Sequence, residues 1–153
     1  MKKLVFIFAL FIVFATAYGQ QLNDKGLYIG SDGELFTGIL TSNNNGVKSE
    51  LSVKNGVVSG DAIYYYASGK VMEKGMFTDG KKDQKWIRFN ENGLTNAVAF
   101  YSLGKKTGTW LVYDDKGIKR FEMNYNNGEK SGIWTSWDEN GVVINTKDYS
   151  IAN

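Results

Sequence analysis

The sequence predicts an all-β protein in which repeated β-hairpins form one elongated, open and twisted antiparallel sheet. Eighteen glycines, nine tyrosines, nine phenylalanines and four tryptophans stand in a chain without proline. Short aromatic runs end at Asn-Gly, Asp-Gly or Ser-Gly, and no stretch keeps helical spacing of apolar residues long enough to form a helix. Glycines and aromatic residues also recur at every twenty-fourth position, as from Gly69 to Gly93. Together these observations indicate short strands joined by tight turns.

Residues 1–19 are predicted to be a secretory signal peptide. Lys2 and Lys3 precede an apolar run over residues 4–15, and small residues follow that run. The run is shorter than the roughly 20 residues of a membrane-spanning helix. Cleavage after Ala17 or after Gly19 fits the pattern, and Gly19 is favoured. Because the chain has no cysteine, it offers no lipid-attachment cysteine and no disulfide. We therefore expect a soluble exported protein, periplasmic or secreted.

Cleavage would change the charge balance. The whole chain carries 18 basic and 16 acidic side chains, and loss of Lys2 and Lys3 leaves 16 of each. A net charge near zero provides no overall cationic field of the kind that attracts nucleic acid. Nucleic acid is therefore not an expected partner.

The period divides the rest of the chain. We expect a lead-in over residues 20–35, hairpin repeats over residues 36–149 and a tail over residues 150–153. Two glycine columns keep the period at every step, and a third is broken once by Gln84. The columns are Gly69, Gly93, Gly117 and Gly141; Gly56, Gly80, Gly104 and Gly128; and Gly60, Gln84, Gly108 and Gly132. Gly38 and Gly46 resemble the first members with small deletions, which gives about five repeats.

Aromatic residues keep the same period and are the predicted structural residues of the repeats. Three columns are present. They are Trp86, Trp110 and Trp134; Tyr65, Phe89, Tyr113 and Trp137; and Phe77, Tyr101, Tyr125 and Tyr149.

Each repeat is predicted to be one hairpin. For example, residues 84–89 and 94–101 have strand length, and residues 90–93 join them. A loop that ends in glycine fits a type I turn whose last residue takes a positive φ. A second turn, around Asp79-Gly80 and its equivalents, links each hairpin to the next. At about 4.8 Å between strands, five hairpins extend about 45 to 50 Å. Because a lone hairpin cannot bury its aromatic side chains, each repeat is expected to supply the core of the next.

The pattern leaves one packing question open. Trp86 and Phe89 differ in parity along their strand, so strict alternation places them on opposite faces. A bulge between them would change this. Either both faces carry aromatic side chains or such a bulge exists.

Four segments share one consensus, in which glycine, tryptophan and a further aromatic residue precede a polar turn and a second glycine. They are GTWLVYDDKG (108–117), GIWTSWDENG (132–141), QKWIRFNENG (84–93) and GDAIYYYASG (60–69). The consensus resembles the MORN (membrane occupation and recognition nexus) repeat, in the longer bacterial variant of antitoxin-like proteins. The resemblance covers roughly residues 36–149; Ala62 departs from the expected tryptophan and Gln84 from the expected glycine. It implies an open hairpin sheet used for binding or scaffolding, with no associated catalytic residues.

The residue types argue against catalysis. With neither histidine nor cysteine, the chain lacks Ser-His-Asp and Cys-His nucleophilic systems and the commonest transition-metal ligands. Acidic residues do recur at the hairpin turns, where solvated turn residues are the ordinary interpretation and paired glycosidase carboxylates the alternative. The turns do not have the ligand pattern of a calcium loop. We expect no enzyme, cofactor or metal site. The acidic residues are Glu91, Asp114, Asp115, Asp138 and Glu139.

Binding is the remaining class of function. A candidate basic rim near the linking turns, diluted by Asp79, Asp83 and Glu129, suits an anionic lipid or wall polymer. Aromatic side chains beyond the needs of one core would form a binding face. The first hypothesis is an exported scaffold or antitoxin-like inhibitor that binds a protein; the alternative is an envelope- or glycan-binding module that uses exposed aromatic rings. The candidate rim consists of Lys81, Lys82, Lys105, Lys106 and Lys130.

Overall fold

The structure, a computed structural model, describes residues 19–150. The predicted signal peptide up to residue 18 and the last three residues of the tail lie outside the described residues. Export and cleavage therefore stay predictions.

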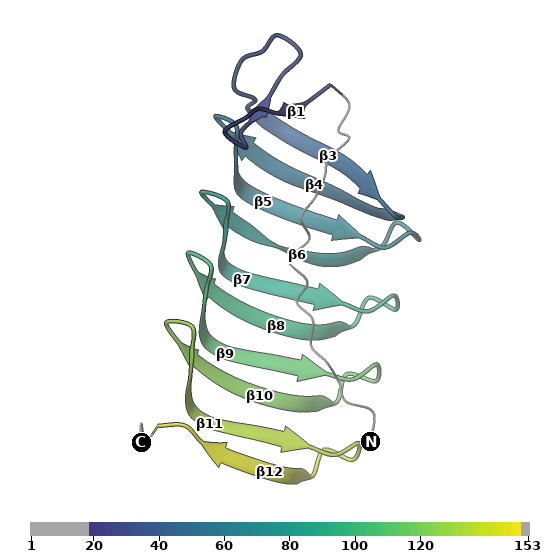
Figure 1. Ribbon diagram of the computed structural model, residues 1–153. Helices are drawn as coiled ribbons and strands as arrows, with labels where there is room; N and C mark the ends of the chain where they lie inside the picture. Colours follow the sequence, from purple (N-terminus) through teal and green to yellow (C-terminus); the bar gives the residue numbers. More distant parts are fainter. Residues whose placement is uncertain (1–18, 151–153) are drawn as a thin grey trace.

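One antiparallel sheet of ten strands contains all the repeats in chain order, and each strand pairs with the next (Figure 1). The five hairpins form a meander whose end strands do not pair with each other, so the sheet is open. Residues 19–150 contain no helix, and the predicted all-β class is confirmed. Its strands are β3 (Gly38–Asn44), β4 (Val47–Lys54), β5 (Val57–Tyr65), β6 (Val71–Thr78), β7 (Lys81–Phe89), β8 (Thr95–Ser102), β9 (Lys105–Tyr113), β10 (Lys119–Asn126), β11 (Glu129–Trp137) and β12 (Val143–Asp148).

Two kinds of turn alternate along the sheet. The links between hairpins are two-residue turns; at one of them Asp79 and Gly80 both have positive φ, 48° and 74°. This combination is the type I′ turn, whose twist matches that of paired strands. Within a hairpin the turn is longer: the Gly93 N–H donates to the Asn90 carbonyl at 2.9 Å, and Gly93 has a φ of 81°. The first hairpin instead uses the two-residue turn Asn45-Gly46, which explains the deletion seen in the sequence.

A side-chain acceptor at the start of the longer turn explains its Asn or Asp. The Asn90 side-chain oxygen accepts the backbone N–H groups of Asn92 and Leu94, both at 3.0 Å. Asp114 and Asp138 make the same pair of contacts in their own turns. These carboxylates are therefore parts of the turn framework rather than free tips.

The lead-in contains a hairpin that the sequence analysis did not anticipate. Strands β1 (Gln21–Leu22) and β2 (Tyr28–Ile29) flank a turn in which Asn23 plays the capping part of Asn90. Tyr28 donates its N–H to the Gly56 carbonyl at 2.9 Å, and the Gly56 N–H donates to the Phe36 carbonyl at 2.8 Å. The lead-in therefore covers the first linking turn.

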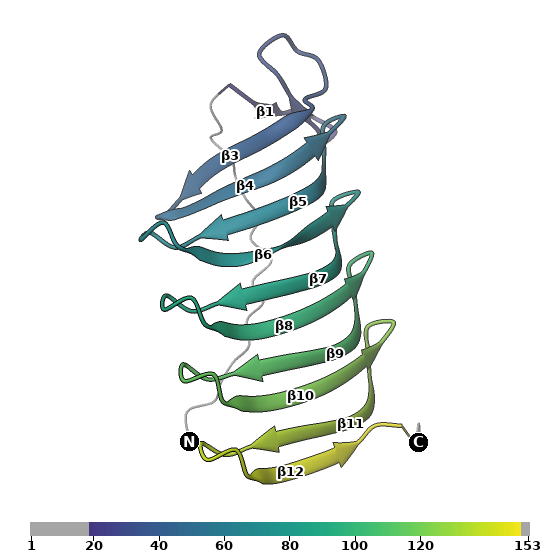
Figure 2. The same ribbon diagram turned by 180° about the vertical axis from the view of Figure 1, so that it is seen from behind.

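A bulge occurs wherever one hairpin pairs with the next. Lys74 and Met76 of β6 pair with Ile87 and Asp83 of β7, so β7 takes a four-residue step where β6 takes two. Strands β5, β9 and β11 have the same irregularity, and all four strands bend near it (Figures 1 and 2). Each bulge has a residue of positive φ, and these residues form the third glycine column: Gly60 (113°), Gln84 (56°), Gly108 (60°) and Gly132 (56°).

Candidate binding surface

Both faces of the sheet carry aromatic side chains. The pairing of β7 with β8 is regular from Gln84 to Arg88, and the register shift between Arg88 and Phe89 places its extra residue in β8, so the alternation of side chains along β7 is unbroken. Trp86 packs over Gly75, where its ring leaves no space for a Cβ atom. Phe89 instead lies under the Lys74 amino group, 5.6 Å from the ring centre. The open question from the sequence is thus answered: the two residues lie on opposite faces.

Each face can be defined by one column of residues. The tryptophan face carries Trp86, Trp110 and Trp134. The isoleucine face carries Ile63, Ile87 and Leu111, which the pairing registers place together with Lys74, Val98 and Glu122.

Aromatic rings contact one another along the tryptophan face. Ring centres lie 5.1 Å apart for Tyr101–Trp110 and for Trp110–Tyr125, 5.2 Å for Tyr125–Trp134 and 4.9 Å for Trp134–Tyr149. These separations are typical of favourable tilted and edge-on ring pairs. The chain of contacts joins residues of successive repeats.

Each indole is also tied to the preceding hairpin. The N–H groups of Trp86, Trp110 and Trp134 donate to the carbonyls of Met76, Phe100 and Asn124 at 3.1, 3.0 and 2.9 Å. Every tryptophan of the column therefore bonds to the residue ten positions before it. The hydrogen bonds thus repeat every 24 residues, as the ring contacts do.

Exposure increases along the tryptophan face. Trp86 and Trp110 are 1% and 2% exposed, whereas Trp134 is only partly buried. Ala62, which stands in the tryptophan position of an earlier hairpin, is fully buried in the cluster that includes Leu40 and Leu51. The N-terminal hairpins thus form the core, and the C-terminal hairpins present part of the same column to solvent.

The lysines of the candidate basic rim divide between the faces. Lys81 and Lys105 are exposed, next to strand partners that place them on the isoleucine face. Lys82, Lys106 and Lys130 lie on the tryptophan face, each with its amino group over two rings. The distances to the ring centres are 3.7 Å (Lys82–Trp86) and 5.7 Å (Lys82–Tyr101), 4.7 Å (Lys106–Trp110) and 4.9 Å (Lys106–Tyr125), and 4.7 Å (Lys130–Trp134) and 5.0 Å (Lys130–Tyr149).

One carboxylate faces these lysines. Within strands β3 to β12, Glu73 is the single acid that the pairing registers place on the tryptophan face, and it is 6% exposed. Its oxygen lies 2.6 Å from the Lys82 amino group. Burial lowers the pKa of Lys82, and the Glu73 charge opposes that effect. Burial also lowers the pKa of Lys106, and the positive charge of Lys130 lowers it further.

The isoleucine face has its own ring column but a balanced charge. Lys48 lies over Tyr65 at 5.2 Å and Lys119 over Trp137 at 4.2 Å. Both lysines also pair with acids, Glu50 and Glu122, at 2.7 and 2.8 Å. Phe89 and Tyr113 complete the column predicted from the sequence, and both are partly buried.

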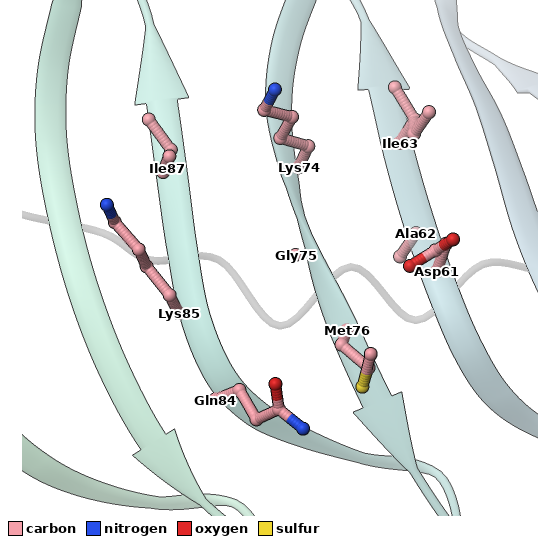
Figure 3. Close-up of a pocket in the computed structure, with 9 residues that line it drawn as sticks. All are labelled: Asp61, Ala62, Ile63, Lys74, Gly75, Met76, Gln84, Lys85 and Ile87. Atoms are coloured by element: carbon pink, nitrogen blue, oxygen red, sulfur yellow. The ribbon is translucent and has the colours of Figure 1, made fainter.

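A shallow pocket of about 400 Å³ opens on the isoleucine face. Ile63, Lys74 and Ile87 come from three neighbouring strands to line it, and Met76 and Lys85 extend it toward the bend of β7 (Figure 3). Its apolar floor and mixed charged margin give it no distinct ligand chemistry.

The acidic turn residues do not assemble into a reactive group. Within residues 19–150, no three acidic side chains lie close enough to hold a metal ion together. Burial pushes the pKa of Asp114 upward, but hydrogen bonds from Ile118, Lys116 and Arg120 outweigh it and lower the pKa. The same described part of the chain contains no helix that is long and apolar enough to cross a membrane.

The fold and its ring columns define a β-hairpin repeat protein. The family model described as "MORN repeat variant" matches residues 59–79, 106–127 and 130–150. These three hairpins are therefore repeats of the MORN type, as the sequence resemblance indicated. The matches fall on the second, fourth and fifth hairpins, and the unmatched third hairpin is the one with Gln84 at its bulge. No curated protein matches the chain.

Proposed function

We propose that this chain is an exported, non-enzymatic module that binds a partner protein along the C-terminal half of its tryptophan face. MORN repeats are generally protein- or membrane-binding modules. The observation that carries the proposal is the set of partly exposed rings in the last two hairpins, Tyr125, Trp134 and Tyr149, with lysine amino groups over them. Tryptophan and tyrosine side chains are among the residues that most often form the energetic centre of a protein interface. A scaffold or an antitoxin-like inhibitor would use such a surface without catalytic residues.

The fifth hairpin offers a matched pair of variants to test this function. Trp134 and Trp137 belong to the same strand, are both partly buried and lie on opposite faces. Residues 20–153, immobilised, would be used to capture proteins from the envelope and medium of the source organism. Trp134→Ala should abolish capture of the specific partner, and Trp137→Ala should retain it. Equal capture by both variants, each shown to be folded by circular dichroism, would contradict the proposed binding face.

Glycan binding is the alternative function. The column Tyr65, Phe89, Tyr113 and Trp137 favours it, because partly exposed rings in a row on a sheet can stack on sugar rings. Sedimentation with purified wall polysaccharide tests it with the same two variants. Loss of polysaccharide binding in Trp137→Ala, with no protein partner captured, would support the alternative.

Export is tested separately. The full chain, produced in a double-membrane bacterium, should appear in the periplasm or medium with Gln20 as its first residue. N-terminal sequencing of the product would give the cleavage site, and retention of the intact chain in the cytoplasm would contradict the export proposal.

A further inference from the structure

The lysines of the tryptophan face are repeated without their counterion. Lys82, Lys106 and Lys130 stand one period apart, but the position of Glu73 becomes Ala97 and then Phe121 in the next repeats. Four ion pairs are present within residues 19–150, and neither Lys106 nor Lys130 belongs to one. The second hairpin therefore supplies an anion to the lysine of the third, and the lysines of the fourth and fifth hairpins receive none from the hairpin before them.

Lys106 is partly buried and Lys130 is exposed, and both amino groups lie against aromatic rings. Each amino group lies within 5.0 Å of two ring centres, which fixes its position on the face. The positive charge of Lys130 already lowers the pKa of Lys106. A bound anion would reduce this repulsion. In the same way, the Glu73 charge opposes the lowering of the Lys82 pKa by burial.

The spacing of the two lysines selects the form of the ligand. Equivalent residues of successive hairpins are two strands apart, or about 10 Å at the usual strand separation. In the extended polyproline II conformation, which has three residues per turn and a rise of about 3.1 Å per residue, side chains three residues apart point to the same side and lie about 9 Å apart. A chain that crosses the strands with an acid at every third residue would therefore place one carboxylate at each lysine.

We propose that the tryptophan face binds an extended acidic segment of a partner protein, whose carboxylates, three residues apart, pair with Lys106 and Lys130. This inference rests on the proposed function, and it adds the chemistry of the partner. A peptide fits better than a membrane, because recognition of an anionic lipid surface typically uses a cluster of about four to eight basic residues, whereas the proposed site has two lysines. In a bound peptide, the backbone amides and small side chains between the acids would also contact Tyr125 and Trp134. The hydrocarbon layer of a membrane would contact the same rings but would bring no carboxylate to the lysines.

Synthetic heptapeptides test the spacing directly. The first has the sequence Glu-Ser-Gly-Glu-Ser-Gly-Glu, and the second contains the same residues as Glu-Glu-Glu-Ser-Gly-Ser-Gly. Binding to residues 20–153 would be followed by tryptophan fluorescence at low salt. The spaced peptide should bind at least fivefold more tightly than the clustered one, and added salt should weaken it. Equal affinity for the two peptides would overturn the proposed register.

Two double variants with the same charge change test the lysines. Lys106→Gln with Lys130→Gln should weaken binding of the spaced peptide at least tenfold. Lys81→Gln with Lys105→Gln changes exposed lysines of the isoleucine face and should leave binding unchanged. Lys106→Arg with Lys130→Arg keeps the cations over the rings and should restore binding. Equal loss in the two glutamine variants, with unchanged unfolding midpoints, would overturn the inference. If the Lys106→Gln, Lys130→Gln variant does not fold, the arginine variant becomes the test. Loss of peptide binding in the folded arginine variant would also overturn the inference.

Other anions provide the remaining outcomes. The probes are vesicles of three parts phosphatidylcholine to one part phosphatidylserine, and a sulfated polysaccharide. If either bound through Lys106 and Lys130 while neither peptide bound, the acidic-segment proposal would be overturned. The result also separates the two proposals: partner capture that requires Trp134 but survives Lys106→Gln with Lys130→Gln contradicts only the inference about charge. Capture that does not depend on Trp134 contradicts the proposed function, whatever the peptides show.

Discussion

Trp86 and Trp134 occupy the same position in the third and fifth hairpins but have different surroundings. Trp86 is 1% exposed, contacts Phe77 at 5.1 Å and lies beneath the Lys82 amino group. Trp134 makes the same indole hydrogen bond, yet it remains partly exposed. In a repeat protein the sequence of a repeat therefore does not set its burial, because neighbouring repeats provide the cover.

The two ends of the sheet explain this difference. At the N-terminal end, Tyr28 of the lead-in and Phe36 at the start of the repeats pack against the core cluster. At the C-terminal end, β12 has a single paired neighbour, and all six of its residues are exposed. Val143 and Ile144 are 51% and 63% exposed. Side chains are therefore more deeply covered in the N-terminal half of the sheet than at its C-terminal end.

The largest expected effect is the loss of stability when the tryptophans of the column are replaced by alanine. Trp86→Ala and Trp110→Ala should each lower the free energy of unfolding by about 3 to 5 kcal/mol, as loss of a fully buried aromatic side chain does. Trp134→Ala should cost about 1 to 2 kcal/mol, since part of its surface is already in contact with water. Urea titration of the three variants measures the order. The same loss in all three would contradict the burial gradient.

The buried ion pair between the second and third hairpins gives the next effect. Glu73→Gln leaves Lys82 without its carboxylate partner in a largely buried position. We expect a loss of about 2 to 3 kcal/mol, below the roughly 3 to 5 kcal/mol of a fully buried pair because water reaches part of Lys82. Glu129→Gln, at an exposed position, is the control and should change stability little. Chemical denaturation that finds equal midpoints for Glu73→Gln and wild type would show that the pair contributes nothing.

A smaller effect of opposite sign concerns the bulge. Gln84 has a φ of 56°, at a position where Gly108 and Gly132 have nearly the same angle. A non-glycine residue in this conformation is strained by about 1 to 2 kcal/mol, so Gln84→Gly should raise stability by about 1 kcal/mol. Gln84→Ala keeps the strain and is the control for loss of the side chain. Thermal unfolding that ranks alanine equal to glycine would show that strain is not the cause.

The smallest effect is a dependence on pH. The Leu103 N–H and the Thr78 hydroxyl donate to Asp83 and lower its pKa below the usual value near 3.8. Because the folded pKa is lower than the unfolded one, this stabilisation is present above about pH 4 and is lost as pH falls through the folded pKa. The next repeats have Thr107 and Ser131 at this position. Asp83→Asn should therefore reduce the dependence of the urea midpoint on pH in the acid range, around and below the usual aspartate pKa. An unchanged slope would assign the acid sensitivity to other groups, such as Asp114.

Most of the architecture could be predicted from the sequence because turns are local. Positive φ at Gly69, Gly93, Gly117 and Gly141 and the two-residue links followed from the glycine columns. The β1–β2 hairpin was missed, although Asn23 and Gly26 show the same turn pattern as Asn90 and Gly93. It was missed because β1 and β2 are each only two residues long and lie outside the repeat period.

The candidate site was less predictable. The sequence grouped Lys81 with Lys82 and Lys105 with Lys106, since adjacent charges suggest one rim. In the structure, alternation along each strand separates the members of each pair onto opposite faces. The unequal neutralisation of Lys82 and Lys106 depends on Glu73, which reaches the lysine from another strand.

The sequence by itself determined the period, the turns and the number of repeats, because each depends on residues close together in the chain. Only the tertiary structure decided which side chains share a face, how deeply each tryptophan is buried and which lysines have a counterion. Those properties depend on the register between strands and on the position of each hairpin in the sheet. Covered and open repeats have similar sequences, so local sequence alone does not distinguish their burial.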